Sequence, residues 1–284
     1  MARSLNGMVV IITGASAGIG QALARDLAGH GARLSLCARR IDRLEALNKE
    51  LGGGHLTICA DVSKEADCQR VVRDSVEHFG RIDTLVCNAG YGFLRKAADT
   101  TREQLEEIFR TNVLGTTDCI SAAVPIMRRQ EPRDGWRGQL MIVSSAVARR
   151  AIPFFGPYSA TKAFQLSLAE ALRVELRPKL IAVTSVHPIG TATEFGDVSA
   201  KLSGRRVQKI PGEIIQTSEQ VAVAMTRAIR HPRPEVWPFR LARLGLGLSA
   251  LFPGLTDKVL GRRGPQIFGD AEAQSAPARS EQSR

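Results

Sequence analysis

Tyr158 and Lys162 are the residues of this 284-residue chain whose types and spacing best suit acid–base chemistry. They lie four positions apart in a segment of helical period, so their side chains share one helix face. A free phenol has a pKa of about 10 and exchanges protons poorly at neutral pH. A cation beside it stabilises the phenolate and lowers that pKa toward the range where general acid–base catalysis is efficient. The pair therefore predicts proton transfer at Tyr158, although a packed tyrosine with an exposed lysine would give the same pattern.

A glycine-rich turn that follows the first apolar run suits a phosphate group. Its residues are Thr13, Gly14, Ala15, Ser16, Ala17, Gly18, Ile19 and Gly20. A phosphate needs backbone N–H donors with no Cβ in the way, and a helix N-terminus adds a favourable dipole. At the first strand-to-helix connection this pattern indicates a dinucleotide site, with a tight turn that holds no ligand as the alternative.

Two arginines, Arg39 and Arg40, follow the second apolar run. In NAD-binding folds an acidic residue at this point bonds the ribose 2′-hydroxyl, whereas an arginine suits the 2′-phosphate of NADP. Asp42 lies too far along to take the acidic role, and we interpret it as the N-cap of the next helix. The sequence therefore favours NADP(H) over NAD(H), with two solvated surface charges as the alternative.

These residues need a scaffold that brings them together, and the chain alternates between two kinds of segment. Apolar runs that predict strands lie at 9–12, 33–37, 56–59, 84–87, 140–143 and 181–186. Segments of helical period lie at 19–28, 43–51, 66–79, 103–127 and 158–176. Strict alternation of buried strands and helices is typical of a doubly wound α/β fold with a parallel sheet. We expect one Rossmann-like domain over 1–230, since no linker or repeat divides it, and a C-terminal helical extension over 231–269.

Taken together, the motifs resemble the short-chain dehydrogenase/reductase family, whose order and spacing they follow over about residues 5 to 230. The matching segments are Thr13-Gly14, Gly18-Ile19-Gly20, Asp61-Val62, Asn88-Ala89-Gly90, Asn112-Val113, Ser144-Ser145, Tyr158 with Lys162, and Pro188 to Thr193. The resemblance implies an oxidoreductase in which hydride passes from a nicotinamide to a carbonyl carbon while Tyr158 protonates the oxygen, or the reverse. The cofactor carries the difficult chemistry, and the protein orients it and supplies the proton.

The resemblance also implies a role for each matching residue. Ser145, thirteen positions before Tyr158, would hold and polarise the substrate oxygen, with Ser144 as the alternative. Lys162 would bond the nicotinamide ribose, and Asn112 would kink its helix and fix a water that links Lys162 to solvent. The implied cofactor contacts are Gly14, Ser16, Gly18, Ile19, Gly20, Arg39, Arg40, Asp61, Val62, Asn88, Ala89, Gly90, Tyr158, Lys162, Pro188, Ile189, Thr191 and Thr193.

The chain departs from the family pattern after the sixth predicted strand, where it has His187, Pro188, Ile189 and Gly190 in succession. The family usually places a glycine directly after the proline, and here that glycine is displaced by one position. We therefore expect the backbone beside the nicotinamide to differ. We interpret His187 as a packing residue rather than a catalytic one.

The substrate side is expected to be largely apolar. In the family the stretch after the sixth strand covers the substrate; here it would be a polar, basic and mobile loop at 194–211. The opposite lip would include Tyr91, Phe93 and Leu94, and residues 146–155 would form the other side, where Val147, Ile152, Phe154 and Phe155 make the wall apolar. These side chains favour a lipophilic ketone, aldehyde or alcohol, although Arg149 and Arg150 leave an acidic or acyl-carrier-bound substrate open.

The net charge of +11 raises nucleic acid and anionic membrane as partners. Residues 227–263 carry eight arginines and lysines against two acids, but no aromatic-studded basic stripe or known module supports nucleic-acid binding. The apolar segment 239–260 is interrupted too often for the roughly 20 residues of a spanning helix. It is expected to pack on the domain, to contact another subunit, or to lie peripherally in a membrane interface. Residues 270–284 are expected to be a disordered tail.

The remaining features bear on compartment, assembly and alternatives. Five cysteines without a CxxC pair argue against a disulfide framework or a metal site, and with no signal peptide they indicate the cytoplasm. By resemblance we expect a homodimer or homotetramer formed through the long fourth and fifth helices.

The alternative function is a catalytically silent NADP(H)-binding sensor or scaffold, which would have no need of Ser145, Tyr158, Lys162 and Asn112 together. An extended epimerase needs a larger substrate domain than the about 120 residues after Lys162 provide.

Overall fold

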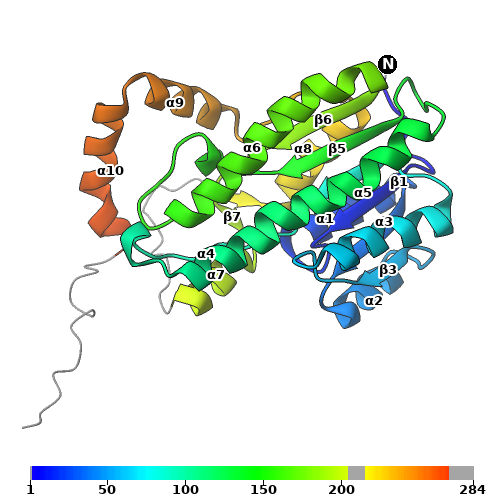
Figure 1. Cartoon of the computed structure of the whole chain (residues 1–284), viewed down its shortest axis with the longest axis horizontal. Helices are drawn as coiled ribbons and strands as arrows, with labels where there is room; N and C mark the ends of the chain where they lie inside the picture. The colour runs from blue at the N-terminus through cyan, green and yellow to red at the C-terminus, as the bar shows by residue number, and fades with distance from the viewer. Residues whose placement is uncertain (1, 204–214, 269–284) are drawn as a thin grey trace, which may run out of the picture.

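A computed structural model of the chain describes residues 2–203 and 215–268. Its centre is a parallel sheet of seven strands in the order β3-β2-β1-β4-β5-β6-β9 (Figure 1). The strands are β1 (Val9–Thr13), β2 (Arg33–Ala38), β3 (Leu56–Cys59), β4 (Thr84–Cys87), β5 (Gly138–Val143), β6 (Ile181–Val186) and β9 (Glu235–Val236). The doubly wound parallel sheet is confirmed, and its first six strands in chain order lie where the apolar runs predict them.

Helices cover both faces of this sheet. They are α1 (Gly18–Gly29), α2 (Ile41–Glu50), α3 (Glu65–Phe79), α4 (Arg102–Phe109), α5 (Gly115–Arg129), α6 (Gly156–Leu176), α7 (Phe195–Ser203), α8 (Ser218–Arg230), α9 (Arg240–Leu251) and α10 (Pro253–Phe268). Neighbouring residues of a strand point to opposite faces. Val10 and Ile12 therefore pack with α1, α2 and α8, whereas Ile11 packs with α3, α5 and α6. The two apolar layers hold the sheet between them and leave the carboxyl ends of its strands at one edge.

Two helices differ from the sequence expectations. The segment 103–127 is not one α-helix, because a π-helical turn at Arg110–Leu114 separates α4 from α5. At the second helix, Arg40 occupies the N-cap position and Asp42 lies in the first turn, so the N-cap assignment of Asp42 was wrong. Asp42 is nevertheless well placed there, since a carboxylate near a helix N-terminus interacts favourably with the helix dipole.

The segment after β6 contains regular structure where a loop was expected. A short strand, β7 (Thr191–Ala192), pairs with β8 (Gln216–Thr217), and α7 follows β7. Thr193 Oγ1 accepts a hydrogen bond of 3.2 Å from Phe195 N and so satisfies a donor at the start of α7. The expected loop at 194–211 is therefore helical up to Ser203. Its residues 204–211, like the tail at 270–284, lie outside the described part of the chain.

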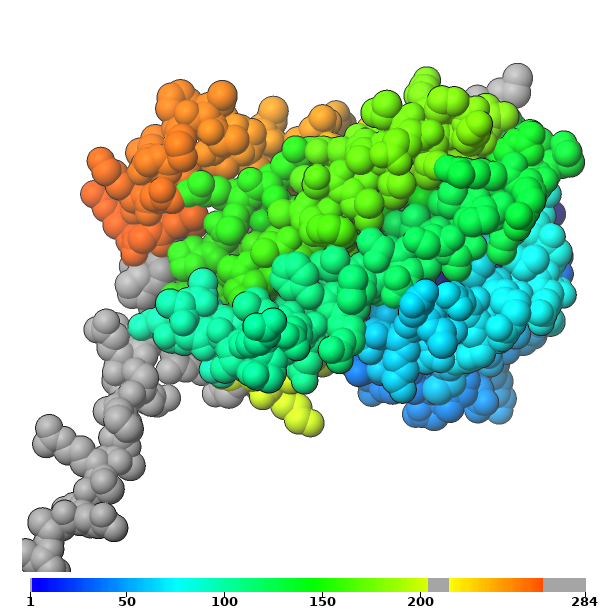
Figure 2. All heavy atoms as spheres, in the orientation of Figure 1, coloured from blue at the N-terminus to red at the C-terminus, as the bar shows by residue number. Residues whose placement is uncertain are grey.

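The chain beyond residue 230, where the C-terminal extension was expected to begin, first adds β9 to the sheet beside β6. Helices α9 and α10 then project from one end of the molecule, at the left in both views (Figure 1, Figure 2). An ion pair between Arg150 and Asp257 connects α10 to the loop after β5. Within residues 2–203 and 215–268, no helix is long and apolar enough to cross a membrane.

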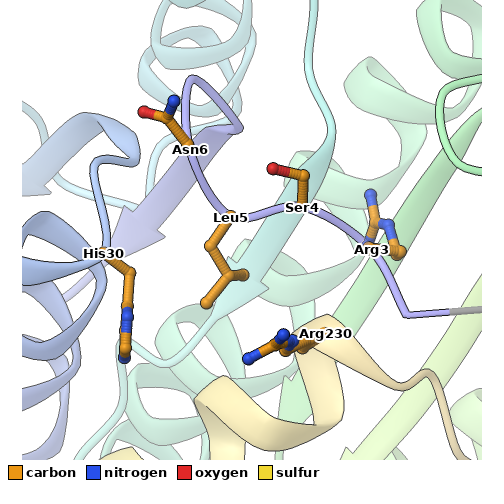
Figure 3. Close-up of a pocket in the computed structure, with 6 residues that line it drawn as sticks. All are labelled: Arg3, Ser4, Leu5, Asn6, His30 and Arg230. Carbon is orange, nitrogen blue, oxygen red and sulfur yellow. The ribbon is translucent and has the colours of Figure 1, made fainter.

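The N-terminal segment lies at the other edge of the sheet, where the strands begin. Arg3 is buried there, and its guanidinium donates to the carbonyl of Asp83 at 2.9 Å and to Gln139 Oε1 at 2.8 Å. A hollow of about 180 Å³ lies beside it, between the N-terminal segment, His30 and Arg230 (Figure 3). Asp83 directly precedes β4, so this hollow is remote from the carboxyl edge, and the contacts of Arg3 join the chain start to the sheet.

Candidate active site

The carboxyl ends of β4 and β5 and the start of α6 converge at the centre of the site. In open parallel sheets, ligands bind at this edge, where the strand order reverses. β5 ends at Val143 and leads directly to Ser145, while Pro157 near the start of α6 places Tyr158 and Lys162 in its first turns. Ser144 is buried, and its hydroxyl donates to the main-chain carbonyl of Lys162 at 2.8 Å. Ser144 therefore anchors α6, and Ser145 is the serine that reaches the Tyr158 hydroxyl.

The Tyr158 phenol is surrounded by apolar groups. Its ring lies 6.0 Å from the Phe155 ring and 5.3 Å from the Phe195 ring, measured between centroids. Burial raises the pKa of Tyr158 to about 12, and the hydrogen bond with Ser145 acts in the opposite direction. The spacing of Tyr158 and Lys162 predicts a lowered pKa. In the structure burial outweighs the hydrogen bond with Ser145, so the phenol keeps its proton.

Lys162 lies beneath this ring, with Nζ 5.6 Å from the ring centroid. Its side chain is 4% exposed, and Nζ donates to the Val143 carbonyl at 2.8 Å and to Gln165 Oε1 at 2.9 Å. Burial lowers the pKa of Lys162 to about 7, because a low-dielectric environment disfavours the ammonium. Lys162 and Tyr158 thus share one helix face, as their spacing predicts.

Asn112 lies in the π-helical turn, which is the expected kink. Its Nδ2 donates to the Tyr91 carbonyl at 2.8 Å and to Thr161 Oγ1 at 3.0 Å, and its Oδ1 accepts from Tyr91 N at 3.1 Å. The side chain therefore joins the turn after β4 to α6. The main-chain carbonyl of Asn112 accepts from Gln165 Nε2 at 2.7 Å and from Thr116 Oγ1 at 2.9 Å.

The glycine-rich turn is closed tightly against the strand beside it. A Cβ at Gly20 would lie 2.4 Å from the Gly14 carbonyl oxygen, so the start of α1 approaches the turn as only glycine allows. Gly14 has φ +69°, a conformation that side chains disfavour. Asn88 Nδ2 donates to the Thr13 carbonyl at 2.9 Å, and the amides of Asn88 and Ala89 donate to Thr13 Oγ1. These bonds hold an open backbone cradle at the end of β1.

The far side of this cradle is formed by the segment after β6. Gly18 faces Thr193, since a Cβ at Gly18 would lie 3.1 Å from Thr193 Cβ. Pro188 lies beside the catalytic serine loop, because its carbonyl accepts from Ala146 N at 2.9 Å. Thr191 Oγ1 donates to the Ile189 carbonyl at 2.8 Å. The structure therefore brings the expected contacts at 188–193 to the same edge as the glycine turn.

Basic residues gather beside the glycine turn. Arg40 donates through Nη1 to Glu194 at 2.9 Å and through Nη2 to Ser16 Oγ at 3.1 Å. Arg43, which the sequence analysis did not select, donates to the other oxygen of Glu194 at 2.5 Å. The two guanidinium groups thus share one carboxylate. Arg39 lies on the same strand end, and its side chain is exposed.

The other expected cofactor residues take the following places. Asp61 follows β3 and its Oδ1 accepts from Ser63 N at 3.0 Å, which stabilises the turn. Val62 is buried against the start of α5, where a Cβ at Gly115 would lie 2.5 Å from the Val62 carbonyl oxygen. Gly90 adjoins the catalytic group directly, since a Cβ there would lie 3.5 Å from Lys162 Nζ.

Two residues that the sequence motifs do not indicate, Gly92 and Phe195, lie against the Tyr158 ring. A Cβ at Gly92 would lie 2.7 Å from Phe195 Cζ and 3.0 Å from Tyr158 Cδ2, so Gly92 is the residue that lets the Tyr158 ring approach the turn after β4. Phe195 is contributed by α7. Phe93 and Leu94, expected at the surface of the site, are buried instead.

The two arginines of the loop after β5 are engaged within the protein. Arg149 donates to Glu235 at 2.6 Å and to Glu170 at 3.1 Å, and Arg150 pairs with Asp257. Both guanidinium groups therefore have carboxylate partners of their own. This pairing reduces their capacity to attract an acidic substrate.

His187 is a packing residue in the structure. It is fully buried, its ring stacks on Trp237 at 4.4 Å, and burial lowers its pKa to about 4. The Ser145 carbonyl, 3.3 Å from Nδ1, only accepts hydrogen bonds, so the neutral ring carries its proton on Nδ1 and accepts from Ser185 Oγ at Nε2. Through its ring nitrogens His187 therefore binds the main chain of Ser145 and the hydroxyl of Ser185.

Comparison with known proteins agrees with this geometry. The sequence matches the family model of the short chain dehydrogenases over residues 8–202. It is 41% identical over 220 residues to 11-beta-hydroxysteroid dehydrogenase 1A of Arabidopsis thaliana, across 75% of this chain and 58% of that protein. The chain thus spans little more than half the length of this curated relative.

Two solved structures resemble the fold. A 3-ketoacyl-(acyl-carrier-protein) reductase from Brucella melitensis, complexed with NADH, has a TM-score of 0.72 at 30% identity and covers 81% of this chain and 93% of its own. An alcohol dehydrogenase from the archaeon Thermococcus sibiricus, complexed with 5-hydroxy-NADP, has a TM-score of 0.68 at 30% identity and covers 80% and 94%. One is complexed with an NAD form and the other with an NADP form, so these likenesses support a nicotinamide cofactor without selecting one of the two forms.

Proposed function

Because the chain belongs to the short chain dehydrogenase family, we propose that it is an NADP(H)-dependent oxidoreductase that transfers hydride between a nicotinamide and a carbonyl or alcohol group. One observation carries the proposal. The Tyr158 phenol is hydrogen-bonded to Ser145 and lies above the buried ammonium of Lys162, beside a glycine cradle. A proton donor, an oxygen-polarising hydroxyl and a cation thus lie together at the edge where such folds bind their ligands.

The residues present fit a dinucleotide. The turn at Gly14, Gly18 and Gly20 presents backbone at positions that a Cβ would obstruct, and α1 begins there with its positive dipole end. Arg40 and Arg43 already hold an oxyanion, the Glu194 carboxylate, beside Ser16. Guanidinium groups bind a phosphate at least as well as a carboxylate. This donor set supports the 2′-phosphorylated cofactor.

In the proposed mechanism the protein's groups orient the substrate and move one proton. Ser145 holds the substrate oxygen, and Tyr158 donates its phenolic proton to that oxygen during reduction or accepts one during oxidation. Lys162 stabilises the phenolate that remains, because its ammonium lies under the ring. Bound NADP(H) supplies the hydride and, in its oxidised form, a positive charge near the phenol.

We further propose that the substrate is lipophilic. Phe155 and Phe195 flank the Tyr158 ring, and the Arg149 and Arg150 side chains nearby are neutralised by carboxylates. An apolar wall with a few polar groups at the reacting centre is typical of sites for small apolar molecules. The name of the Arabidopsis relative, a hydroxysteroid dehydrogenase, is consistent with such a substrate.

Two further proposals concern partners. Exposed apolar side chains on the helices expected at a subunit interface, Leu114 and Phe164 among them, support a homo-oligomer. On α9 the leucines 241, 244, 248 and 251 are each more than half exposed and lie along one stripe at helical spacing. Three basic residues lie on α9 and α10 as well, namely Arg240, Lys258 and Arg262. We propose that the enzyme is cytoplasmic and that this apolar and basic face binds an anionic membrane surface.

The decisive experiment is a panel of ketones and aldehydes, scored by loss of NADPH absorbance with NADH in parallel. We expect NADPH-dependent reduction that favours apolar carbonyls. Tyr158→Phe removes the proton donor while keeping the ring, so kcat should fall by roughly 10²- to 10⁴-fold while NADPH affinity is kept. A Thr57→Val variant, which removes a hydroxyl from β3 and leaves the groups around Tyr158 unaltered, serves as the control.

Two results would contradict the proposal. A Tyr158→Phe enzyme with most of its activity would refute the catalytic assignment. NADPH binding without turnover of any carbonyl or alcohol would instead support a silent cofactor-binding sensor.

A further inference from the structure

Gln165 is a fully buried polar side chain that bonds to Lys162 and to the region around Asn112. It lies three residues after Lys162 on α6. Its Oε1 accepts from Lys162 Nζ at 2.9 Å, and its Nε2 donates to the Asn112 carbonyl at 2.7 Å and to Thr116 Oγ1 at 2.9 Å. The side chain therefore joins α6 to the π-helical turn.

The orientation of this carboxamide is determined by its neighbours. A lysine ammonium has only donors and a main-chain carbonyl only accepts, so the oxygen must face Lys162 and the nitrogen must face Asn112. The Thr116 hydroxyl donates its own proton to the Asn112 carbonyl at 2.9 Å, which leaves its oxygen free to accept from Gln165. All donors and acceptors of the bridge are thus matched, and a reversed amide would place two acceptors or two donors together.

We infer that Gln165 is a positioning residue that holds the Lys162 ammonium beneath Tyr158 and links it directly to the main chain of Asn112. The inference rests on the proposed oxidoreductase function, because it concerns the cation that serves Tyr158. An amide does not give up its N–H protons near neutral pH. The link from Lys162 to Asn112 therefore fixes position and does not conduct protons.

The charge state of Lys162 depends on this bridge. Burial lowers its pKa to about 7, and the titratable side chain that faces it is Tyr158, on the same helix. The acceptors that oppose this shift are the Val143 carbonyl and Gln165 Oε1. Hydrogen bonding to a charged form favours that form, so removal of one of two acceptors lowers the pKa further. A carboxylate in the same place raises it.

Two near-isosteric variants test the inference in opposite directions. Gln165→Met keeps the volume and removes the bridge, and Gln165→Glu keeps an acceptor and adds a negative charge. The pKa of Lys162 is followed by NMR of ¹³Cε-labelled lysine, with the signal assigned by its loss in Lys162→Arg. We expect the pKa to fall by about one unit in Gln165→Met and to rise by a similar amount in Gln165→Glu. The neighbouring Leu166→Met, also buried on α6, is the matched control.

Kinetics give a second readout. The alkaline limb of kcat should shift to lower pH in Gln165→Met and to higher pH in Gln165→Glu, with little change in KM, because the substrate does not touch this residue. Thr116→Val, which removes one acceptor of Gln165 Nε2 without altering Lys162's own partners, should shift the limb in the direction of Gln165→Met by a smaller amount. It also keeps the test available if a Gln165 variant does not fold.

The outcomes separate this inference from the proposed function. A lysine pKa that is unchanged in folded Gln165→Met and Gln165→Glu, or unchanged in Thr116→Val when those do not fold, overturns the positioning role. The NMR titration needs no substrate, so opposite pKa shifts would uphold the role of Gln165 even if no carbonyl were turned over by the unaltered enzyme. A loss of kcat without any pH shift would mean that Gln165 is merely structural.

Discussion

At the residue scale, the proposed preference for NADP(H) rests on the contact between Arg40, Arg43 and Glu194. All three side chains are 43% exposed, and exposed ion pairs contribute only about 0–1 kcal/mol to stability. The Glu194 carboxylate is therefore weakly held and is easily exchanged for another oxyanion. A phosphate carries more charge and three acceptor oxygens, so it competes well for the same two guanidinium groups.

If the 2′-phosphate replaces the Glu194 carboxylate, substitution of an arginine and substitution of Glu194 should change NADPH affinity in opposite directions. Arg43→Ala should weaken NADPH binding by roughly tenfold, because a hydrogen bond to a charged group is lost, and should leave NADH binding nearly unchanged. Glu194→Gln should strengthen NADPH binding several-fold, since a competing carboxylate is removed. Nicotinamide fluorescence on binding measures both affinities.

Arg25→Ala is the matched control, because the Arg25–Glu50 pair is similarly exposed but joins α1 to α2 away from Glu194. If Arg43→Ala weakened NADH and NADPH equally, Arg43 would not contact the 2′-phosphate.

At the scale of elements, the junction of β6 and β9 supports the catalytic loop. His187 follows β6, stacks on Trp237 just after β9, and bonds the Ser145 carbonyl. Since β9 is only two residues long, this stacked pair adds a side-chain contact to the main-chain bond between His187 N and the Val236 carbonyl. The position of Ser145 thus depends on β9, a strand that no apolar run of the sequence predicts.

His187 predicts an acid-sensitive stability. Its folded pKa is about 4, against 6.5 in the unfolded chain, so the unfolded state binds the extra proton as pH falls. The free energy of unfolding should be unaffected by this group above pH 6.5 and should fall between pH 6.5 and 4, by about 3 kcal/mol in total. Urea unfolding at several pH values measures the slope.

In His187→Gln the slope between pH 6.5 and 4 should become shallower, whatever the stability of that variant at pH 7. His78→Gln, at an exposed position of α3, should keep the slope of the unaltered protein. Equal slopes in all three proteins would contradict the assignment.

At the scale of the whole molecule, α9 and α10 lie together at one end, at the left of the view (Figure 2). Leu244 is 67% exposed and Leu251 71%, although soluble surfaces seldom present leucines in one continuous stripe. The pair between Arg150 and Asp257 connects α10 to the loop that leads to Tyr158. A lipid surface under this arm would therefore lie next to the apolar wall of the site.

This arrangement predicts reversible, salt-sensitive vesicle binding. The full chain should co-sediment at low salt with vesicles that contain phosphatidylserine and should be released by high salt, since basic residues supply part of the attraction. Replacing both Leu244 and Leu248 by glutamine should abolish binding, whereas Val223→Gln, at an exposed apolar position of α8, should not.

Sedimentation of the same proteins without vesicles distinguishes the alternative. If the double variant changed from oligomer to monomer, the stripe would be a subunit contact instead of a lipid-binding face. Equal vesicle binding by the double variant would also reject the lipid-binding face.

The sequence by itself determined the parallel sheet, because strands buried on both faces must be continuously apolar and helices must alternate with them. It also determined that Tyr158 and Lys162 share a helix face, since a separation of four residues fixes this through local geometry alone. The sequence also indicated where the turn requires glycine, as at Gly14 and Gly20, because a Cβ at either position would clash with neighbouring backbone.

Only the tertiary structure decided which groups surround those residues. Contacts between segments distant in the chain determine the roles of Gln165, Arg43, Gly92 and Phe195. The hydrophobic periodicity of the sequence does not indicate such contacts. Burial likewise reversed the expectation for the phenol: the pKa of Tyr158 rises to about 12 because desolvation there exceeds the effect of the hydrogen bond with Ser145. Spacing fixes which side chains lie on one face, whereas packing fixes how much water and which partners they keep.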